Sequence, residues 1–507
     1  MEHLQRRCGV LMHPTSLPSE YGIGSLGEEA MAFVDLLKRA KVTLWQILPL
    51  GPTGYGDSPY AARSTFAGNE LLIDVKLLVY DGFLEIEDIL THPVFPKKRI
   101  DYELVRSFKE PLLKKAADAF LVMPKNEQKE SYETFCQENN WWLEDYGLYQ
   151  VLCSVYNDSR WNSMWPKELG LRNPSALKTA RETYANEIEQ VKVQQYFFFK
   201  QYKAVKTYAN ANGIEIIGDI PIFVAPDSVD AWANTRLLKM DKNGRQTASS
   251  GVPPDAFSTE GQLWGNPVYN WPEHEKEHFA WWIRRIQETL KLCDIVRIDH
   301  FRGFSAYWEV PLGETTAIKG KWVPAPGMKL LSALRQALGD SIPLIAEDLG
   351  VITEDVEKLR DENNLPGMKI LQFAFSSENG KLDATNAYLP HNCQYNSVIY
   401  TGTHDNNTTV GWYTELGAET KDKVRRYLEA PDDQVIWQML RVMLMSASKY
   451  AILPIQDLLG LGSEGRMNVP STCGKGNWSW QLQSLDLDVW RVDRLRGMIE
   501  IYGREGL

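Results

Sequence analysis

Arg297 and Asp299 place a cation and a carboxylate two residues apart in a short apolar segment, CDIVRIDHFRGF, which begins at Cys293. In an extended strand, residues two apart point to the same face, so the two charges would lie together. A nearby cation lowers the pKa of a carboxyl group, and an ionised carboxylate can act as a nucleophile. Taken alone, the segment is equally consistent with a structural ion pair.

Two further carboxylates also follow apolar segments. Glu347 follows four apolar residues in PLIAEDLG, where burial would raise its pKa as a general acid requires. Its neighbour Asp348 would point the other way on a strand and could cap the next helix. Asp405 follows His404 in GTHDN, where both side chains could contact sugar hydroxyls. Two carboxyl groups that flank a glycosidic bond can cleave it, so glycosidic chemistry is one prediction.

Eight short apolar segments that end in Gly, Pro or charged residues could position these side chains. Such segments are typical of buried parallel strands, and helical patterns lie between most of them, as at 28–40, 328–338 and 436–447. Eight strand-helix units predict an α/β fold with a closed (β/α)₈ TIM barrel. The alternative is a doubly wound open sheet, but no G-x-G-x-x-G opens a helix after a strand. The segments begin at Cys8, Val42, Gly213, Cys293, Pro343, Met368, Asn396 and Tyr450.

Polar residues fall near the C-terminal ends of these segments, which form the catalytic face of a barrel. A strand-end carboxylate can also be a helix N-cap, but six polar residues spread over five units make that a poor account of them all. A single His at a strand end, such as His404, is more often structural. Asp219 could instead hold the barrel mouth together. The six are Asp219, Asp299, Glu347, His404, Asp405 and Asp457.

The spacing of the segments predicts one catalytic barrel over residues 1–507, with two insertions and no separate C-terminal β domain. Residues 75–200, approximately, are rich in helix formers and predict a mainly helical insertion. The second insertion, approximately 225–290, contains GVPPDAFSTEGQLWGNPVYNW, which predicts a loop that presents aromatic rings and is neither helix nor strand.

The amino-acid composition excludes some classes of binding partner. The formal net charge of −11 does not suit a nucleic-acid partner, and no run of about 18 apolar residues predicts a membrane span. The six scattered cysteines include no C-x-x-C and suit a reducing cytoplasm. The 17 Trp and 22 Tyr suit either core packing or stacking against sugar rings.

One segment, His274 to His278, matches the zinc-protease pattern H-E-x-x-H. That motif needs both His on one face of an apolar helix. Here the segment is heavily charged, which predicts a solvated turn, and no third ligand stands out downstream. We therefore predict no metal site.

Several long motifs resemble those of glycoside hydrolase family 77, the 4-α-glucanotransferases or amylomaltases. RIDHFRG, IAEDLG and GTHDN carry the carboxylates, and the resemblance is weakest in the helical insertion. It also covers GVLMHPTSLPSEYGIGSLG, WQILPLGPTGYGDSPY, GDIPIFVAPDSVDAW, GVPPDAFSTEGQLWGNP and GLGSEGRMNVP.

The resemblance implies a retaining mechanism on maltooligosaccharides and α-1,4-glucans, with no cofactor or metal. Asp299 matches the nucleophile, Glu347 the acid/base and Asp405 the transition-state stabiliser. Family members often have an aromatic residue where this chain has Ala256, which leaves the contacts to longer acceptors open. The positions that match sugar contacts are Tyr60, Ser58, Asp219, Phe257, Gln262, Trp264, Arg297, His300, His404 and Asn468.

Other functions remain open on the residues alone. Three carboxylates explain hydrolysis and transfer equally well, because the two reactions differ only in what attacks the glycosyl-enzyme. A non-catalytic glucan-binding protein would explain the aromatic residues but not the full set of carboxylates. A barrel aldolase needs a Lys at a strand end, and none of the eight segments ends in one. The resemblance favours transfer.

Overall fold

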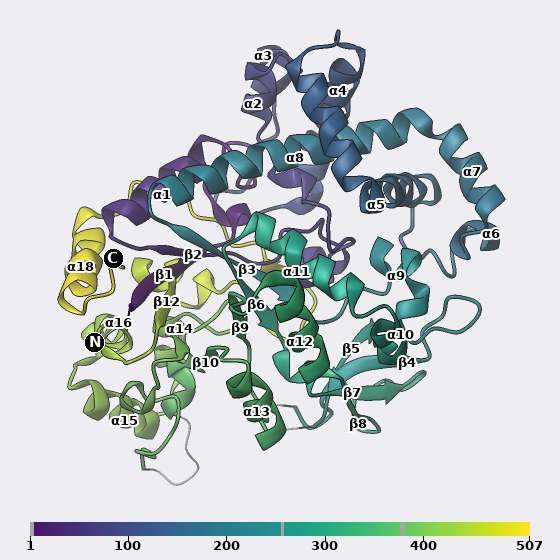
Figure 1. Cartoon of the computed structure of the whole chain (residues 1–507). Coiled ribbons are helices and arrows are strands. Elements are labelled where there is room, and N and C mark those ends of the chain that lie inside the picture. The colour runs from purple at the N-terminus through teal and green to yellow at the C-terminus, as the bar shows by residue number, and fades with distance from the viewer. Residues whose placement is uncertain (1–4, 255–257, 376–380, 507) are drawn as a thin grey trace.

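Eight parallel strands close into a barrel in the computed structural model, which describes residues 5–254, 258–375 and 381–506 (Figure 1). Around the barrel the order is β1-β12-β11-β10-β9-β6-β3-β2, so each strand lies beside its neighbours in the chain. All eight predicted segments form these strands, and the TIM barrel is confirmed. Their bounds are β1 (Arg7–Leu11), β2 (Leu44–Gln46), β3 (Glu215–Pro221), β6 (Ile295–Asp299), β9 (Leu344–Ala346), β10 (Gly367–Ile370), β11 (Ser397–Tyr400) and β12 (Tyr450–Pro454).

Helices cover the outside of the barrel, which is why its strands are apolar on both faces (Figure 1). Helix α1 is typical: Phe33, Val34 and Leu37 are buried, while acidic residues occupy its first turn and basic residues its last, as the helix dipole favours. The main covering helices are α1 (Glu28–Arg39), α8 (Ala185–Ala211), α11 (Ala280–Leu292), α12 (Gly327–Leu338), α13 (Glu354–Glu362), α16 (Val435–Met445) and α18 (Val489–Ile501).

A group of helices occupies the chain between β2 and β3, and α8 joins it to the barrel (Figure 1). Helix α8 packs against α1 and also against α4 and α5. Aromatic rings fill the space between these helices, as where Phe120 meets Phe83, Tyr132 and Phe197. Besides α8, the helices are α2 (Val75–Tyr80), α3 (Ile86–Leu90), α4 (Tyr102–Val122), α5 (Glu127–Tyr156), α6 (Lys167–Gly170) and α7 (Pro174–Thr183).

A second sheet, antiparallel and ordered β5-β4-β7-β8, was not predicted. Its strands are β4 (Ala248–Val252), β5 (Gln262–Pro267), β7 (Ala306–Pro311) and β8 (Lys321–Pro324). The prediction that residues 251–271 hold no strand was therefore wrong for β5. Strand β5 pairs with β4, and β4 pairs in turn with the distant β7, so its backbone finds partners that local sequence does not reveal.

The H-E-x-x-H segment does not form a continuous helical face. Helix α10 (Trp271–Lys276) ends before His278, whose φ is +51°. The expected solvated turn was wrong for His274, which is fully buried with its Nε2 3.1 Å from the Leu237 carbonyl oxygen. Burial lowers the pKa of His274 to about 4, so it is neutral at pH 7.

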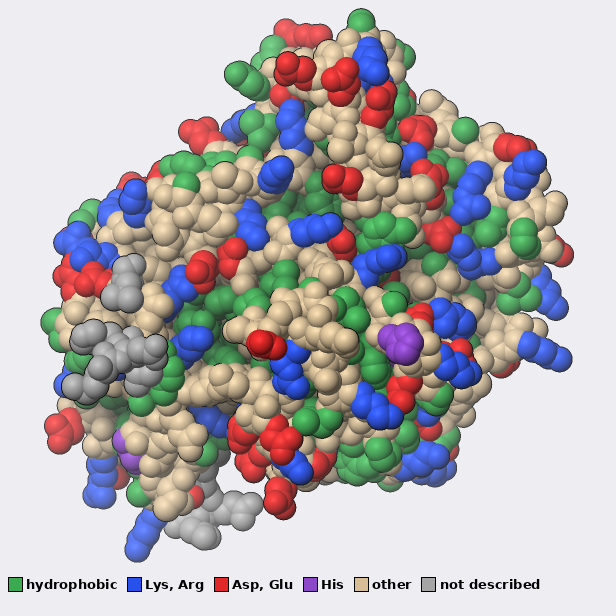
Figure 2. All heavy atoms as spheres, viewed as in Figure 1, with side chains coloured by type: hydrophobic (Ala, Val, Ile, Leu, Met, Phe, Trp, Pro, Cys, Tyr) green, Lys and Arg blue, Asp and Glu red, His purple; other side chains and the backbone are tan. Residues whose placement is uncertain are grey.

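The surface carries acidic and basic side chains that are mixed over the face shown in Figure 2. Among the helices that the structure describes, none has the length and apolar character to cross a membrane.

The remaining helices are α9 (Val229–Ala233), α14 (Thr409–Glu415), α15 (Ala418–Leu428) and α17 (Ile455–Leu459).

Candidate active site

The C-terminal ends of neighbouring barrel strands bring the predicted polar residues together. Register pairs Asp219 of β3 with Arg297 of β6, so both side chains point to the same side. Asp299 is the last residue of β6, and Glu347 directly follows β9, the next strand around the barrel. The face predicted to be catalytic therefore carries these four side chains at its centre.

Arg297 bridges two carboxylates from below the barrel mouth. Its buried guanidinium donates from Nη1 to Asp219 Oδ2 at 2.6 Å and from Nη2 to Asp299 Oδ1 at 2.9 Å. The Tyr60 hydroxyl also donates to Asp219 Oδ2, at 2.6 Å, which ties the β2–α2 loop to the barrel. Asp219 Oδ1 is buried and has no hydrogen-bond partner among the described residues, so it can still accept from a ligand.

The electrostatics of Asp299 differ from the prediction. Burial raises its pKa to about 6, and the lowering effect of Arg297 only partly offsets this. The predicted net direction was wrong because desolvation, with the negative charges of Asp219 and Asp405, outweighs one guanidinium. Asp299 is still mainly ionised at pH 7, and its side chain remains 31% exposed at the open mouth.

Glu347 lies in a cradle of two backbone amides. The amide of His300 donates to Oε2 at 2.7 Å and that of Leu349 donates to Oε1 at 3.0 Å. His300 has φ +54°, so the chain turns sharply after β6 at the residue whose amide meets Glu347. Burial, then the charge of Asp299, raises the pKa of Glu347 to about 8, in the predicted direction.

Asp348 does not cap the next helix, contrary to the prediction. Its Oδ1 accepts from the Met368 amide at 2.7 Å and its Oδ2 from Arg360 Nη1 at 2.5 Å. Thr353 is instead the residue that precedes α13. Asp348 thus joins the end of β9 to β10 and to α13, and it faces away from the site as strand alternation requires.

Asp405 is held by a segment that follows β12. Asn468 Nδ2 donates to Asp405 Oδ1 at 2.7 Å, and Arg466 Nη2 donates to the Asp405 carbonyl oxygen at 2.6 Å. His404 Nε2 lies 3.5 Å from Asp405 Oδ2. The prediction named Asn468 but missed Arg466, although both belong to the same quoted motif, GLGSEGRMNVP.

An aromatic wall borders the carboxylates. The ring of Tyr60 stacks on His404 with centroids 5.1 Å apart, and Trp478 lies 5.6 Å from Tyr60 and 5.7 Å from His404. Ser58 accepts from the Tyr60 amide at 3.2 Å, so its hydroxyl caps the turn that carries this ring. The sequence did not predict Trp478 as a site residue, because no local pattern distinguishes it from the other tryptophans.

The second sheet also contributes side chains to the site. Trp264 of β5 meets the His300 ring edge-on at 4.7 Å and donates from Nε1 to Gln262 Oε1 at 3.2 Å. Three predicted sugar contacts, Trp264, His300 and Gln262, therefore lie together, although the sheet that carries two of them was not predicted. Phe257 and Ala256 lie outside the described residues.

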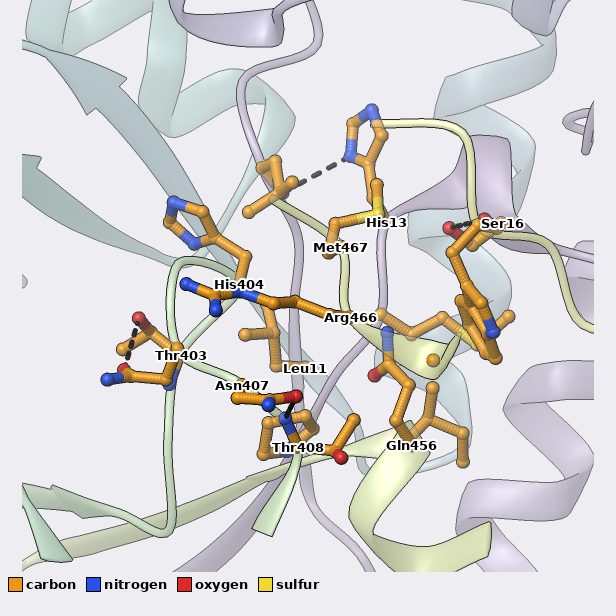
Figure 3. Close-up of a pocket in the computed structure, with 17 residues that line it drawn as sticks. Leu11, His13, Ser16, Thr403, His404, Asn407, Thr408, Gln456, Arg466 and Met467 are labelled. Carbon is orange, nitrogen blue, oxygen red and sulfur yellow. Dashed lines mark hydrogen bonds between the residues drawn. The ribbon is translucent and has the colours of Figure 1, made fainter. Parts of the chain in front are cut away.

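A small cavity with polar and apolar walls lies behind the loop that carries Asp405, and its polar border includes His13, His404, Asn407 and Arg466 (Figure 3). His13 Nδ1 accepts from the Leu48 amide at 3.2 Å, and burial lowers the pKa of His13 to about 3. The His13 imidazole is therefore neutral at pH 7 and adds no positive charge under the loop.

Asp457, the sixth polar residue at a strand end, has a structural environment. Its buried carboxylate accepts from the hydroxyls of Thr401 and Thr409 at 2.6 and 2.7 Å and from the Thr409 amide at 2.7 Å. It thereby fixes the β11 loop to β12, and it is the strand-end residue for which the cap-like interpretation holds.

Comparisons with known proteins identify the family of the chain. The family model described as 4-alpha-glucanotransferase matches residues 12–488. The 4-alpha-glucanotransferases of Thermus thermophilus and Synechocystis are each 46% identical, covering 98% and 99% of this chain and 99% of their own. An amylomaltase from Streptococcus agalactiae, solved in complex with acarbose, has a TM-score of 0.94 and 40% identity over 99% of this chain and 100% of its own. The chain therefore belongs to glycoside hydrolase family 77, the family of the 4-alpha-glucanotransferases.

Proposed function

We propose that this enzyme moves α-1,4-glucan segments from a donor maltodextrin to the 4-hydroxyl of an acceptor glucan or glucose, by a retaining double displacement. One observation carries the proposal: Asp299 and Glu347 lie at the C-terminal ends of neighbouring strands, where burial raises the pKa of Asp299 to about 6 and that of Glu347 to about 8. At pH 7 the first is mainly ionised and the second mainly protonated. A nucleophile and a general acid need those two states.

In the first step, Asp299 attacks the anomeric carbon while Glu347 gives its proton to the glycosidic oxygen. The C–O bond to the leaving chain breaks, and a β-linked glycosyl-enzyme ester forms at Asp299. Arg297 holds the attacking carboxylate by a hydrogen bond to Oδ1, which leaves Oδ2 for the attack. The departing chain carries the proton on its new 4-hydroxyl.

In the second step, Glu347 changes from acid to base. Once Asp299 is an ester, its negative charge no longer raises the pKa of Glu347. The two backbone amides then favour the carboxylate form. Glu347 takes the proton of the acceptor 4-hydroxyl, the acceptor oxygen attacks the anomeric carbon, and the α-linkage is restored.

The surrounding residues would hold the donor sugar. Asp405, kept in place by Asn468 and Arg466, offers an acceptor to ring hydroxyls in the transition state. Asp219 Oδ1 and His300 Nε2, both buried without a partner among the described residues, offer further hydrogen bonds. The Tyr60–His404 stack and Trp264 supply ring faces and edges, and Gln262 lies beside Trp264.

The pH dependence of kcat/KM follows from the two carboxyl groups. We expect the rate to rise through a pKa of about 6 as Asp299 ionises and to fall through about 8 as Glu347 loses its proton. Because the groups interact, the two limbs report the pair. The measurement is kcat/KM for maltotriose from pH 4 to 10; a rate that keeps increasing above pH 9 would contradict the acid role of Glu347.

The product set from maltotriose separates transfer from hydrolysis. Transfer predicts glucose together with a ladder of maltodextrins longer than maltotriose, since the acceptor is another sugar. Hydrolysis, the alternative function, predicts glucose and maltose with no longer products. Chromatography of an early time course with wild-type enzyme gives the answer, and the absence of any longer product would refute the proposed transfer.

A further inference from the structure

A second pocket lies away from the carboxylates, where the helical insertion meets the barrel. Helices α5, α9 and α11 border it, and Figure 1 shows α9 and α11 beneath α5. Its volume is about 250 Å³, just below the roughly 300–1,000 Å³ of pockets that take drug-sized ligands, so it has room for about one or two sugar rings and is open to solvent. The β2–α2 loop lines it through Ser64 and Phe66, and the same loop carries Tyr60 into the active site.

Aromatic side chains form the floor of this pocket. Trp141 of α5 is 36% exposed, and Phe66 meets it edge-on at 4.6 Å. Trp281 of α11 lies 6.3 Å from Phe66, again edge-on. The indole Nε1 of Trp281 is buried and has no hydrogen-bond partner among the described residues. A buried indole N–H without a partner is costly, and an oxygen-rich ligand in the pocket would satisfy it.

The charged side chains around the floor favour a neutral ligand. Asp145, Asp230 and Glu277 outnumber Arg236 and Arg284 by one, so the pocket has no excess of positive charge to attract an anion. Arg236 is bound to Glu277 at 2.6 Å. Arg284 lies over the Trp141 ring at 4.3 Å. Donors and acceptors beside aromatic rings are what a polyol needs.

We propose that this pocket is a second, non-catalytic binding site for an α-1,4-glucan chain, which anchors long substrates beside the active site. The inference rests on the proposed use of α-1,4-glucans as donor and acceptor. A glucose ring would lie against Trp141, with Arg284 moved aside, and a sugar hydroxyl oxygen would accept from Trp281 Nε1. Short oligosaccharides that fill only the active site gain nothing from the pocket.

The test compares Trp141→Ala and Trp281→Phe with wild-type enzyme on glycogen and on maltotriose. Trp281→Phe keeps an aromatic ring and removes the N–H. Trp490→Ala is the matched control, because Trp490 is 50% exposed on α18 and also has an arginine, Arg491, over its ring. Native gels cast with glycogen measure binding, and initial rates measure the apparent KM for each substrate.

We expect Trp141→Ala to weaken glycogen binding and raise the apparent KM for glycogen roughly two- to tenfold, the effect of one lost aromatic contact. Trp281→Phe should show a smaller loss in the same direction, and maltotriose kinetics should stay unchanged in both. Wild-type glycogen binding in both variants would overturn the proposal, as would an equal loss on maltotriose or the same loss in Trp490→Ala. Gel binding needs no turnover, so it tests the pocket even if the transferase proposal fails.

Discussion

Asp299→Asn is expected to lower kcat on maltotriose by roughly 10⁴- to 10⁶-fold, because an amide cannot form the glycosyl ester. The fold should survive, since the Asn side-chain oxygen can still accept from Arg297 Nη2, which donates to Asp299 Oδ1 at 2.9 Å. Glucan affinity should remain measurable by calorimetry, because Tyr60, Asp219 and Trp264 are untouched. The measurement is kcat alongside that affinity.

Asp294→Asn is the matched control for this variant. Asp294 lies just before the same strand, at its opposite end, where it accepts from the Ile216 amide at 2.8 Å and pairs with Lys206 at 3.2 Å. It is remote from the mouth, and we expect near wild-type turnover. Substantial activity in Asp299→Asn, or an equal loss in Asp294→Asn, would contradict the nucleophile assignment.

Glu347→Gln is expected to lower kcat on maltotriose roughly 10²- to 10⁴-fold, because the leaving oxygen and the acceptor lose their proton donor and base. The loss in the first step should be much smaller with α-maltosyl fluoride, since fluoride departs without a proton. The alkaline limb of the pH profile should also disappear. Stopped-flow release of fluoride measures the first step separately from turnover.

A stability control accompanies Glu347→Gln. Both carboxylate oxygens accept from backbone amides, and glutamine can accept from only one of them. We therefore expect a loss of about 1–3 kcal/mol in the free energy of unfolding, measured by urea denaturation. Fluoride release as slow as in Asp299→Asn, from a folded variant, would contradict the acid role.

The barrel was predictable because its signal is local. Each of the eight strands is a short and largely apolar segment, and parallel strands between helices are buried on both faces. The sheet β5-β4-β7-β8 was not predictable from local sequence, because β4 pairs with β7, which lies about sixty residues later in the chain. In addition, Gly265 and Pro267 give β5 the composition of a loop. Pairing between strands so far apart in the chain produces no recognisable pattern in the sequence of either strand.

The site was predictable in its residues more than in its energetics. Arg297 and Asp299 share a face by spacing alone, and their 2.9 Å contact is what that spacing predicted. The pKa of Asp299 was not predictable, because it depends on burial and on Asp219 and Asp405, which come from other strands. The amide cradle of Glu347 was likewise hidden, since backbone donors leave no trace in residue types.

Trapping of the covalent intermediate tests the central claim most directly. In Glu347→Gln, α-maltosyl fluoride should still glycosylate the nucleophile, while the loss of the base slows the second step, so the ester accumulates. Proteolysis and tandem mass spectrometry then locate the maltosyl group. We predict a maltosyl ester on Asp299; an adduct on Asp219 or Asp405, or continued turnover with no adduct on any carboxylate, would contradict the proposed mechanism.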